Sequence, residues 1–231
     1  MNKNLEYLIL IVMIYVAIDL SSMVFAYKLI KIGSVVTAAS SIIFPLTYSI
    51  MDITAEVYGY QVAKKIIWYG FVCDLIFAVT VLIITLIPSL TQSETLAYAQ
   101  VLGSLLRAVI AQMIGVLSGA FINIYLISKW KVMTRGKYFW LRSIGSSIVG
   151  EGVMLIVSVL IALIGVLSFP QLMYLIMYTY LYKIFFAIAA APFVSLIALI
   201  MKSKIDEKHL NSILLNPLNI PNNKGFSPNF Q

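Results

Sequence analysis

Charged side chains are scarce in this chain. Only 11% of its 231 residues are charged, whereas 61% are hydrophobic. Soluble domains carry about 25% charged residues, and no water-soluble core of this size could hide so much apolar surface. The mean hydropathy of +0.99 points the same way. The composition therefore predicts an integral membrane protein.

Cysteine and histidine are almost missing. Cys73 is the single cysteine, which excludes a disulfide within the chain. His209 is the single histidine, so there is no basis for a histidine metal site. The sequence also lacks a metal-ligand pair, a nucleophile elbow and a Walker loop. We therefore expect neither an enzyme nor a bound cofactor or metal.

The net charge of +7 does not indicate a nucleic-acid partner. The basic residues lie between apolar runs, where membrane topology requires them. The chain has no soluble domain that could present a basic patch with interleaved aromatic residues. The expected surroundings are a lipid bilayer, and the sequence leaves a homo-oligomer open.

Long apolar runs dominate the rest of the chain. A transmembrane helix needs about 20 apolar residues. The first run is longer than the apolar part of a signal peptide and no small-residue cleavage site follows it, so we expect it to remain as a span. We expect one all-α domain over 1–202 and a polar, disordered tail over 203–231. The six predicted spans are 5–27, 34–51, 65–87, 99–128, 143–167 and 172–201.

Lysine and arginine collect on one side of the predicted spans, and the opposite side has only Lys28 and Lys31. By the positive-inside rule, both termini are expected in the cytoplasm. The expected location of this multi-pass protein is the bacterial inner (plasma) membrane. Three spans in each half would place the halves in opposite orientation, as in inverted-repeat transporters. No sequence match between the halves accompanies this geometry. The basic side contains Lys3, Lys64, Lys65, Lys129, Lys131, Arg135, Lys137, Arg142 and the lysines of the tail.

Five ionisable residues lie inside the apolar runs: Asp19, Asp74, Arg107, Glu151 and Lys183. Such residues are costly in hydrocarbon and usually face a cavity or a partner. The helical rise places Asp74, Glu151 and Lys183 about 12–15 Å deep, and Asp19 and Arg107 about 9–12 Å from the outer face. We therefore expect an inner cluster of the first three and an outer pair of the last two. The alternatives are purely structural ion pairs or an Arg107 that extends outward.

The segment 44–59 has a second set of polar features. Pro45 removes a helical hydrogen bond and is expected to kink the second span. Asp52 and Glu56 are four residues apart and share one helix face. Gly59 is a natural end of that helix. Two carboxylates on one face repel each other, so we expect a partner group with hydrogen-bond donors or positive charge. The alternative is a solvated helix end without such a partner.

These residues resemble the vitamin uptake transporter (VUT) family, which is better described as queuosine precursor transporters. The resemblance covers nearly all of 15–202, and its most specific part runs from Pro45 to Gly59. Asn123 and Met154 depart from it, because the family usually has Asp at the first position and often at the second, and here Glu151 lies one turn before Met154. The matching features are the segment 44–59, the following 63–67, Arg107 sixteen residues before Asn123, 140–142 leading into Ser146 and Ser147, Lys183 followed by Pro192, and Ser21–Ser22.

The resemblance implies uptake of 7-deazaguanine compounds, the cyano or aminomethyl precursors of queuosine. A carboxylate can accept both the N–H and the amine of a guanine-like edge. Asp52 or Glu56 is the candidate for that contact, with Glu151 as the alternative. Lys183 or Arg107 would donate to the ring carbonyl or hold the carboxylates ionised. Flat bases also stack on aromatic rings, for which the nearby candidates are Phe44, Tyr48, Tyr58 and Trp68.

Two alternative functions remain open at this point. One is a related transporter for a different small heterocycle. The other is the substrate-binding subunit of an energy-coupling-factor vitamin importer, which also has six spans. Such subunits resemble one another in an Ala-x-x-x-Ala contact on the first span. Here the first span offers only Ser22 and Ala26, whereas Ala187 and Ala191 have that spacing in the last span.

Overall fold

The computed structural model describes residues 3–25, 28–32, 35–102, 105–163, 165 and 167–204. Within this part of the chain, helices account for almost all regular structure. The predicted tail over 203–231 lies almost entirely outside the described residues and stays a prediction. The elements are α1 (Lys3–Val24), β1 (Leu29–Ile32), β2 (Val35–Ala38), α2 (Ser40–Ile43), α3 (Pro45–Val57), α4 (Tyr60–Thr85), α5 (Gln92–Leu102), α6 (Leu105–Met133), α7 (Phe139–Leu163) and α8 (Phe169–Lys202).

Five helices in the described residues are long and apolar enough to cross a membrane. They correspond to five of the six predicted apolar runs. Many of their large apolar side chains are exposed on the outside of the bundle, as expected where lipid surrounds the protein. The five candidate spans are Leu5–Val24, Tyr60–Thr85, Val109–Met133, Phe139–Leu163 and Phe169–Lys202.

The prediction of one continuous span over 34–51 is wrong. Its first residues form β2, which pairs antiparallel with β1 from Leu29↔Ala38 to Ile32↔Val35. A short α2 follows, and α3 begins at Pro45. The β-branched residues of β2 favour a strand, and Pro45 lacks the N–H that would continue α2 without a break. Phe44 keeps helical dihedrals (φ −56°, ψ −37°), so the break between α2 and α3 is local.

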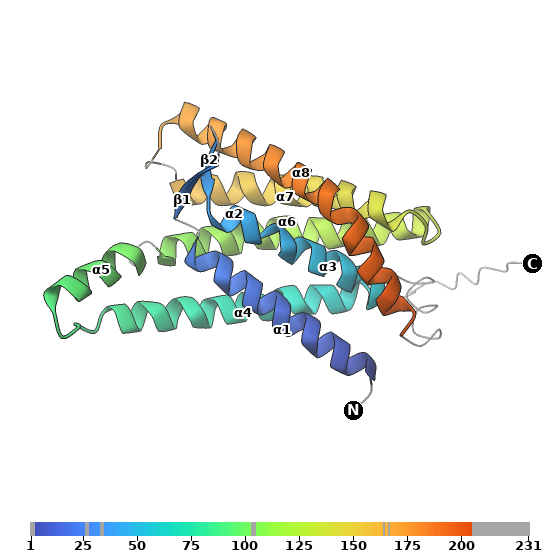
Figure 1. The fold of residues 1–231 in the computed structure, drawn as a ribbon, viewed down its shortest axis with the longest axis horizontal. Helices are drawn as coiled ribbons and strands as arrows, with labels where there is room; N and C mark the ends of the chain where they lie inside the picture. Colours follow the sequence, from blue (N-terminus) through green and yellow to red (C-terminus); the bar gives the residue numbers. More distant parts are fainter. Residues whose placement is uncertain are drawn as a thin grey trace, which may run out of the picture.

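Helices α4, α6 and α7 run along the longest axis of the molecule, and α1 and α8 cross it obliquely (Figure 1). The start of α1, the α6–α7 connection and the end of α8 lie toward one side, here called the basic end because Lys131, Arg142 and Lys202 are located there. The β1–β2 hairpin and α5 lie toward the opposite side, here called the hairpin end (Figure 1). Helices α2 and α3 lead from the hairpin end to the basic end. A sixth span and an inverted repeat stay predictions.

Helix α3 occupies the centre of the bundle. It packs against α1, α4, α6, α7 and α8, and most of its side chains are buried. Met51 and Ala55 belong to a core with residues of α1, α4 and α6, whereas Ile53 and Val57 pack against Val194 of α8. The polar side chains of α3 therefore project into the interior of the bundle and require partners there.

Helices α6 and α7 pack closely where Gly119 and Gly150 face each other. A Cβ on Gly150 would lie 2.8 Å from the Asn123 Cβ and 2.8 Å from the Gly119 carbonyl oxygen. A Cβ on Gly119 would overlap the carbonyl oxygen of Gly150 and lie 2.7 Å from the Tyr48 hydroxyl. Because the carbonyl oxygens of Gly119 and Gly150 are backbone atoms, side-chain rotation cannot relieve the contacts with them.

Gly119→Ala is therefore expected to destabilise the protein by about 1–3 kcal/mol, the usual cost of overpacking a core. Gly152→Ala is the matched control, because its new Cβ would lie 3.1 Å from the Tyr180 ring, a side chain that can shift. Thermal unfolding in detergent should show a clearly lower Tm for the first variant and a small change for the second. Equal Tm values for both variants would contradict the close backbone packing.

Candidate functional site

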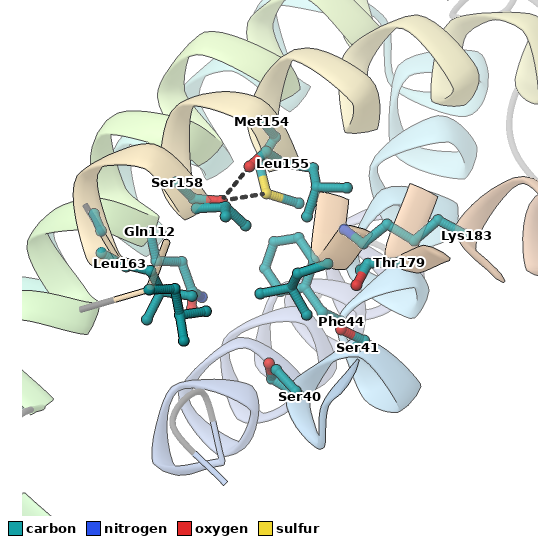
Figure 2. A pocket seen from close by; sticks show the side chains of 16 residues that line it. Ser40, Ser41, Phe44, Gln112, Met154, Leu155, Ser158, Leu163, Thr179 and Lys183 are labelled. Atoms are coloured by element: carbon teal, nitrogen blue, oxygen red, sulfur yellow. Dashed lines mark hydrogen bonds between the residues drawn. The ribbon is translucent and has the colours of Figure 1, made fainter. Parts of the chain in front are cut away.

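A cavity of about 250 Å³ opens near the hairpin end. Its walls come from β2, α2, α6, α7, α8 and Phe44, the residue between α2 and α3. The lining is mainly apolar, with few polar side chains, which is typical of small-molecule sites. Figure 2 shows these side chains converging on one space. The polar ones are Ser40, Ser41, Gln112, Ser158, Thr179 and Lys183.

Lys183 brings a buried charge to this cavity. Its side chain extends from α8 toward the Phe44 ring (Figure 2), and its Nζ lies 4.9 Å from the ring centroid. The same Nζ lies 3.4 Å from Oε2 of Glu151 on α7. Lys183 and Glu151 are each only 3% exposed, so each charge depends on the other in this setting. The structure thus brings together two of the predicted site residues.

Asp52 has a separate, uncharged set of partners. Its Oδ1 accepts a 2.6 Å hydrogen bond from Nδ2 of Asn123, and its Oδ2 accepts hydrogen bonds from the hydroxyls of Ser143 and Ser147. All four side chains are buried. Asn123 is one of the two positions at which the sequence departs from the family that it resembles, and here its amide donates to a carboxylate, which an ionised Asp could not do.

Glu56, one turn further along α3, is bound by cations from three helices. Nη1 of Arg142 donates to its Oε2 at 3.0 Å, Lys131 Nζ lies 3.6 Å from the same oxygen, and Lys202 contacts Oε1. Lys131 also donates to the Glu56 carbonyl oxygen at 2.7 Å. Burial alone would raise the pKa of the Glu56 carboxyl, but the three positive charges outweigh it and hold that pKa below its ordinary value. Glu56 thereby joins α3 to α6, α7 and α8.

Neither Asp52 nor Glu56 lines the cavity. Glu56 is twelve residues along α3 from Phe44, a distance of about 18 Å at the helical rise. The shared helix face predicted for Asp52 and Glu56 therefore leads from the cavity toward the basic end. The predicted partners are present and belong to the protein itself: Asp52 has hydrogen-bond donors, and Glu56 has positive charges.

Asp74 does not join Glu151 and Lys183, contrary to the inner cluster expected from depth. It is buried on α4, where its charge interacts with that of Asp19 on α1, and Tyr15 lies within reach of both carboxylates. Asp19 also accepts a 3.4 Å hydrogen bond from Gln112. Arg107 belongs to α6, but its side chain lies outside the described residues, so its expected pairing with Asp19 stays a prediction.

Sequence reasoning missed several residues of these clusters. The sequence assigns Lys131 to membrane topology and Arg142 to topology and the family resemblance, but predicts no partner for either, yet both are buried against Glu56. Their positions at the ends of α6 and α7, level with the end of α3, were the available signal. Gln112 and Thr179 gave no signal, because a neutral polar residue in an apolar run is common. The described part of the chain contains no group of three or more His, Cys, Asp or Glu side chains that could bind a metal ion.

Several span-length apolar helices around buried ion pairs and a cavity define a multi-pass membrane protein. A family model described as "Putative vitamin uptake transporter" matches residues 38–197, which is more than half of the chain. The chain belongs to this family, as the resemblance of its motifs indicated. The family is one of transporters and not of enzymes. No curated protein and no solved structure matches the chain.

Proposed function

We propose that the protein imports 7-deazaguanine compounds, the cyano or aminomethyl precursors of queuosine, across the bacterial inner membrane. The observation that carries this proposal is the cavity in which Lys183, paired behind the wall with Glu151, meets the ring of Phe44. Small-molecule sites usually measure about 300–1,000 Å³. The cavity of about 250 Å³ is slightly smaller than this range and suits one bicyclic ring system better than a large vitamin.

The groups around this cavity match the chemistry of a guanine-like ring. Phe44 offers an aromatic face for stacking. Lys183 is a donor for the ring carbonyl. Glu151 does not line the cavity, but its buried Oε2 lies 3.4 Å from Nζ of Lys183, which does. Glu151 is therefore better placed than Asp52 or Glu56 to accept the N–H and amine of the substrate when Lys183 turns toward the carbonyl.

The proposed orientation has both termini in the cytoplasm, with the segment from β2 to Met51 of α3 forming a sixth passage through the membrane and Glu56 lying beyond its cytoplasmic end. The charge asymmetry of the sequence supports it, because Lys131, Arg142 and Lys202 all lie at the basic end. In this orientation the cavity lies toward the outside and the Glu56 cluster toward the cytoplasm. The arrangement suits a transporter that receives its substrate from outside.

The importer-subunit alternative receives less support. Ala191 is 3% exposed and Ser22 is fully buried, so neither of the two small-residue pairs presents a free surface to a partner helix. A related transporter for another flat heterocycle with a carbonyl and neighbouring donors fits the same cavity. That alternative differs from the proposal only in the substrate and is separated from it by the experiment below.

Expression of the protein should restore queuosine in tRNA in a bacterial strain that cannot make the precursor and lacks its own importer. The cyano and the aminomethyl 7-deazaguanine are supplied separately at limiting concentration, and queuosine in tRNA is measured. The control is an empty vector, with a high precursor concentration to show that the later enzymes work. Restoration with either compound supports the proposal, whereas no restoration with both, despite protein in the membrane, overturns the substrate assignment.

A further inference from the structure

The side-chain amide of Gln112 is held in one orientation by helix α1. Its Nε2 lies 3.4 Å from Oδ1 of Asp19 and 3.5 Å from Oγ of Ser22. Ser22 uses its own hydroxyl proton to donate to the Asp19 carbonyl oxygen at 2.7 Å, so toward Gln112 it acts as an acceptor. Both neighbours on α1 are therefore acceptors, and they require the NH₂ group of Gln112 on their side.

This orientation leaves Oε1 of Gln112 as an acceptor for the cavity that the same residue lines. The two described hydrogen bonds of the Gln112 side chain are both donated by Nε2. Figure 2 shows Gln112 and Lys183 on opposite sides of the cavity, with Phe44 between them. A flat ligand on the Phe44 ring would therefore meet a donor, Lys183, at one edge and an acceptor at the other.

We propose that Gln112 determines specificity by accepting a hydrogen bond from a ring N–H of the substrate, on the edge opposite the one that faces Lys183. Asp19 is then a positioning residue, which acts on the substrate only through the amide of Gln112. The inference rests on the proposed function. A 7-deazaguanine fits this pattern, because its pyrrole N–H lies across the ring system from its carbonyl oxygen.

The burial of Asp19 and Ser22 supports a built arrangement rather than a chance contact. Both side chains are at least 98% buried, yet they point their acceptors at a residue of the cavity wall. Asp19 also lies beside Tyr15 and the carboxylate of Asp74, both of them buried. Two buried acceptors on α1 thus hold the NH₂ group of Gln112 in this orientation.

The test compares uptake of a 7-deazaguanine with uptake of its analogue methylated on the pyrrole nitrogen, using purified protein in liposomes. The wild type should prefer the parent compound by about three- to tenfold, the range of one net hydrogen bond. Gln112→Met has a similar length but no acceptor, so it should lose this preference by taking up less parent compound. Gln100→Met, the same change at an exposed position on α5, should keep it.

Asp19→Asn tests the positioning role, because an asparagine side chain can donate as well as accept and no longer fixes the Gln112 amide. We expect a higher KM for the parent compound, an almost unchanged maximal rate, and a preference that falls toward that of Gln112→Met. Asp19→Glu, which keeps an acceptor, should restore part of the preference. A purely structural role of Asp19 would instead lower uptake of both compounds by the same factor.

The outcomes separate this inference from the function on which it rests. Uptake of the parent compound by the wild type, combined with an unchanged preference in Gln112→Met, would overturn the inference alone. No uptake of either compound by the wild type would overturn the proposed function and the inference together. Loss of the preference in Gln112→Met, with Gln100→Met unchanged, supports the inference.

Discussion

Replacing Lys183 with methionine should abolish uptake. Methionine has a similar length, but it removes the ammonium group that lies 4.9 Å from the centre of the Phe44 ring and 3.4 Å from Glu151. Without Lys183 the cavity loses its donor for a ring carbonyl, and Glu151 becomes a buried carboxylate without its counter-charge. Both effects reduce substrate binding. Radiolabelled precursor uptake by cells, normalised to protein in the membrane, measures the result.

The destabilising effect of the change is controlled by a double variant. Breaking a buried ion pair costs about 3–5 kcal/mol, because one charge remains uncompensated. Lys183→Met combined with Glu151→Gln removes both charges and should recover much of the lost stability, seen as membrane abundance and as a single peak in size-exclusion chromatography. Uptake should stay absent in the double variant. Normal uptake by either variant would contradict the assignment of Lys183 to the substrate site.

Glu56→Gln should cause the largest loss of stability among the acidic residues of α3. Lys131 and Arg142 are almost fully buried around this carboxylate, and Lys202 is 26% exposed in its side chain. Glutamine keeps the shape but leaves three positive charges close together without a counter-charge. By analogy with other broken buried pairs, the expected loss is about 3–5 kcal/mol. Thermal unfolding in detergent measures it, with Glu94→Gln on the exposed face of α5 as the control.

The pH dependence of stability gives a second test of the Glu56 cluster. The pKa of Glu56 is lowered from its ordinary value of 4.5. A carboxyl with a lowered pKa contributes stability above its ordinary pKa and loses it as the pH falls through the lowered value. The wild type should therefore lose more of its Tm in this acidic range than Glu56→Gln does. Parallel pH profiles for the two proteins would contradict the ion cluster.

The sequence predicts which charged residues are buried better than it predicts which residues they contact. Depth along a helix follows from counting residues, and it correctly brought Glu151 and Lys183 together. The direction in which a side chain points around the helix axis does not follow from depth. Depth alone therefore groups Asp74 with Glu151, although the face of α4 that carries Asp74 is turned toward Asp19 on α1. Gly70, one turn earlier on α4, shows the same packing, because a Cβ there would lie 2.8 Å from the Tyr15 ring of α1.

Two other differences have equally local causes. The apolar composition of 34–51 satisfies a membrane span, but hydropathy does not distinguish a β-branched strand followed by a broken helix from one straight helix. The positive-inside rule explains Arg142 fully without a partner, so nothing in the sequence required its guanidinium to reach Glu56 at 3.0 Å. The all-α bundle and five of its apolar helices, by contrast, follow from long-range composition and were predicted.

The glycine contacts between α6 and α7 have a mechanical consequence. Two helices whose backbones touch at Gly119 and Gly150 resist sliding or rotation against each other, so they are expected to behave as one rigid body during transport. Relative motion would then occur where side chains, and not backbones, form the contact. The interface of this pair with α3 is one such place, because hydrogen bonds of Asp52 and ion pairs of Glu56 connect it, and these can break and re-form within a transport cycle.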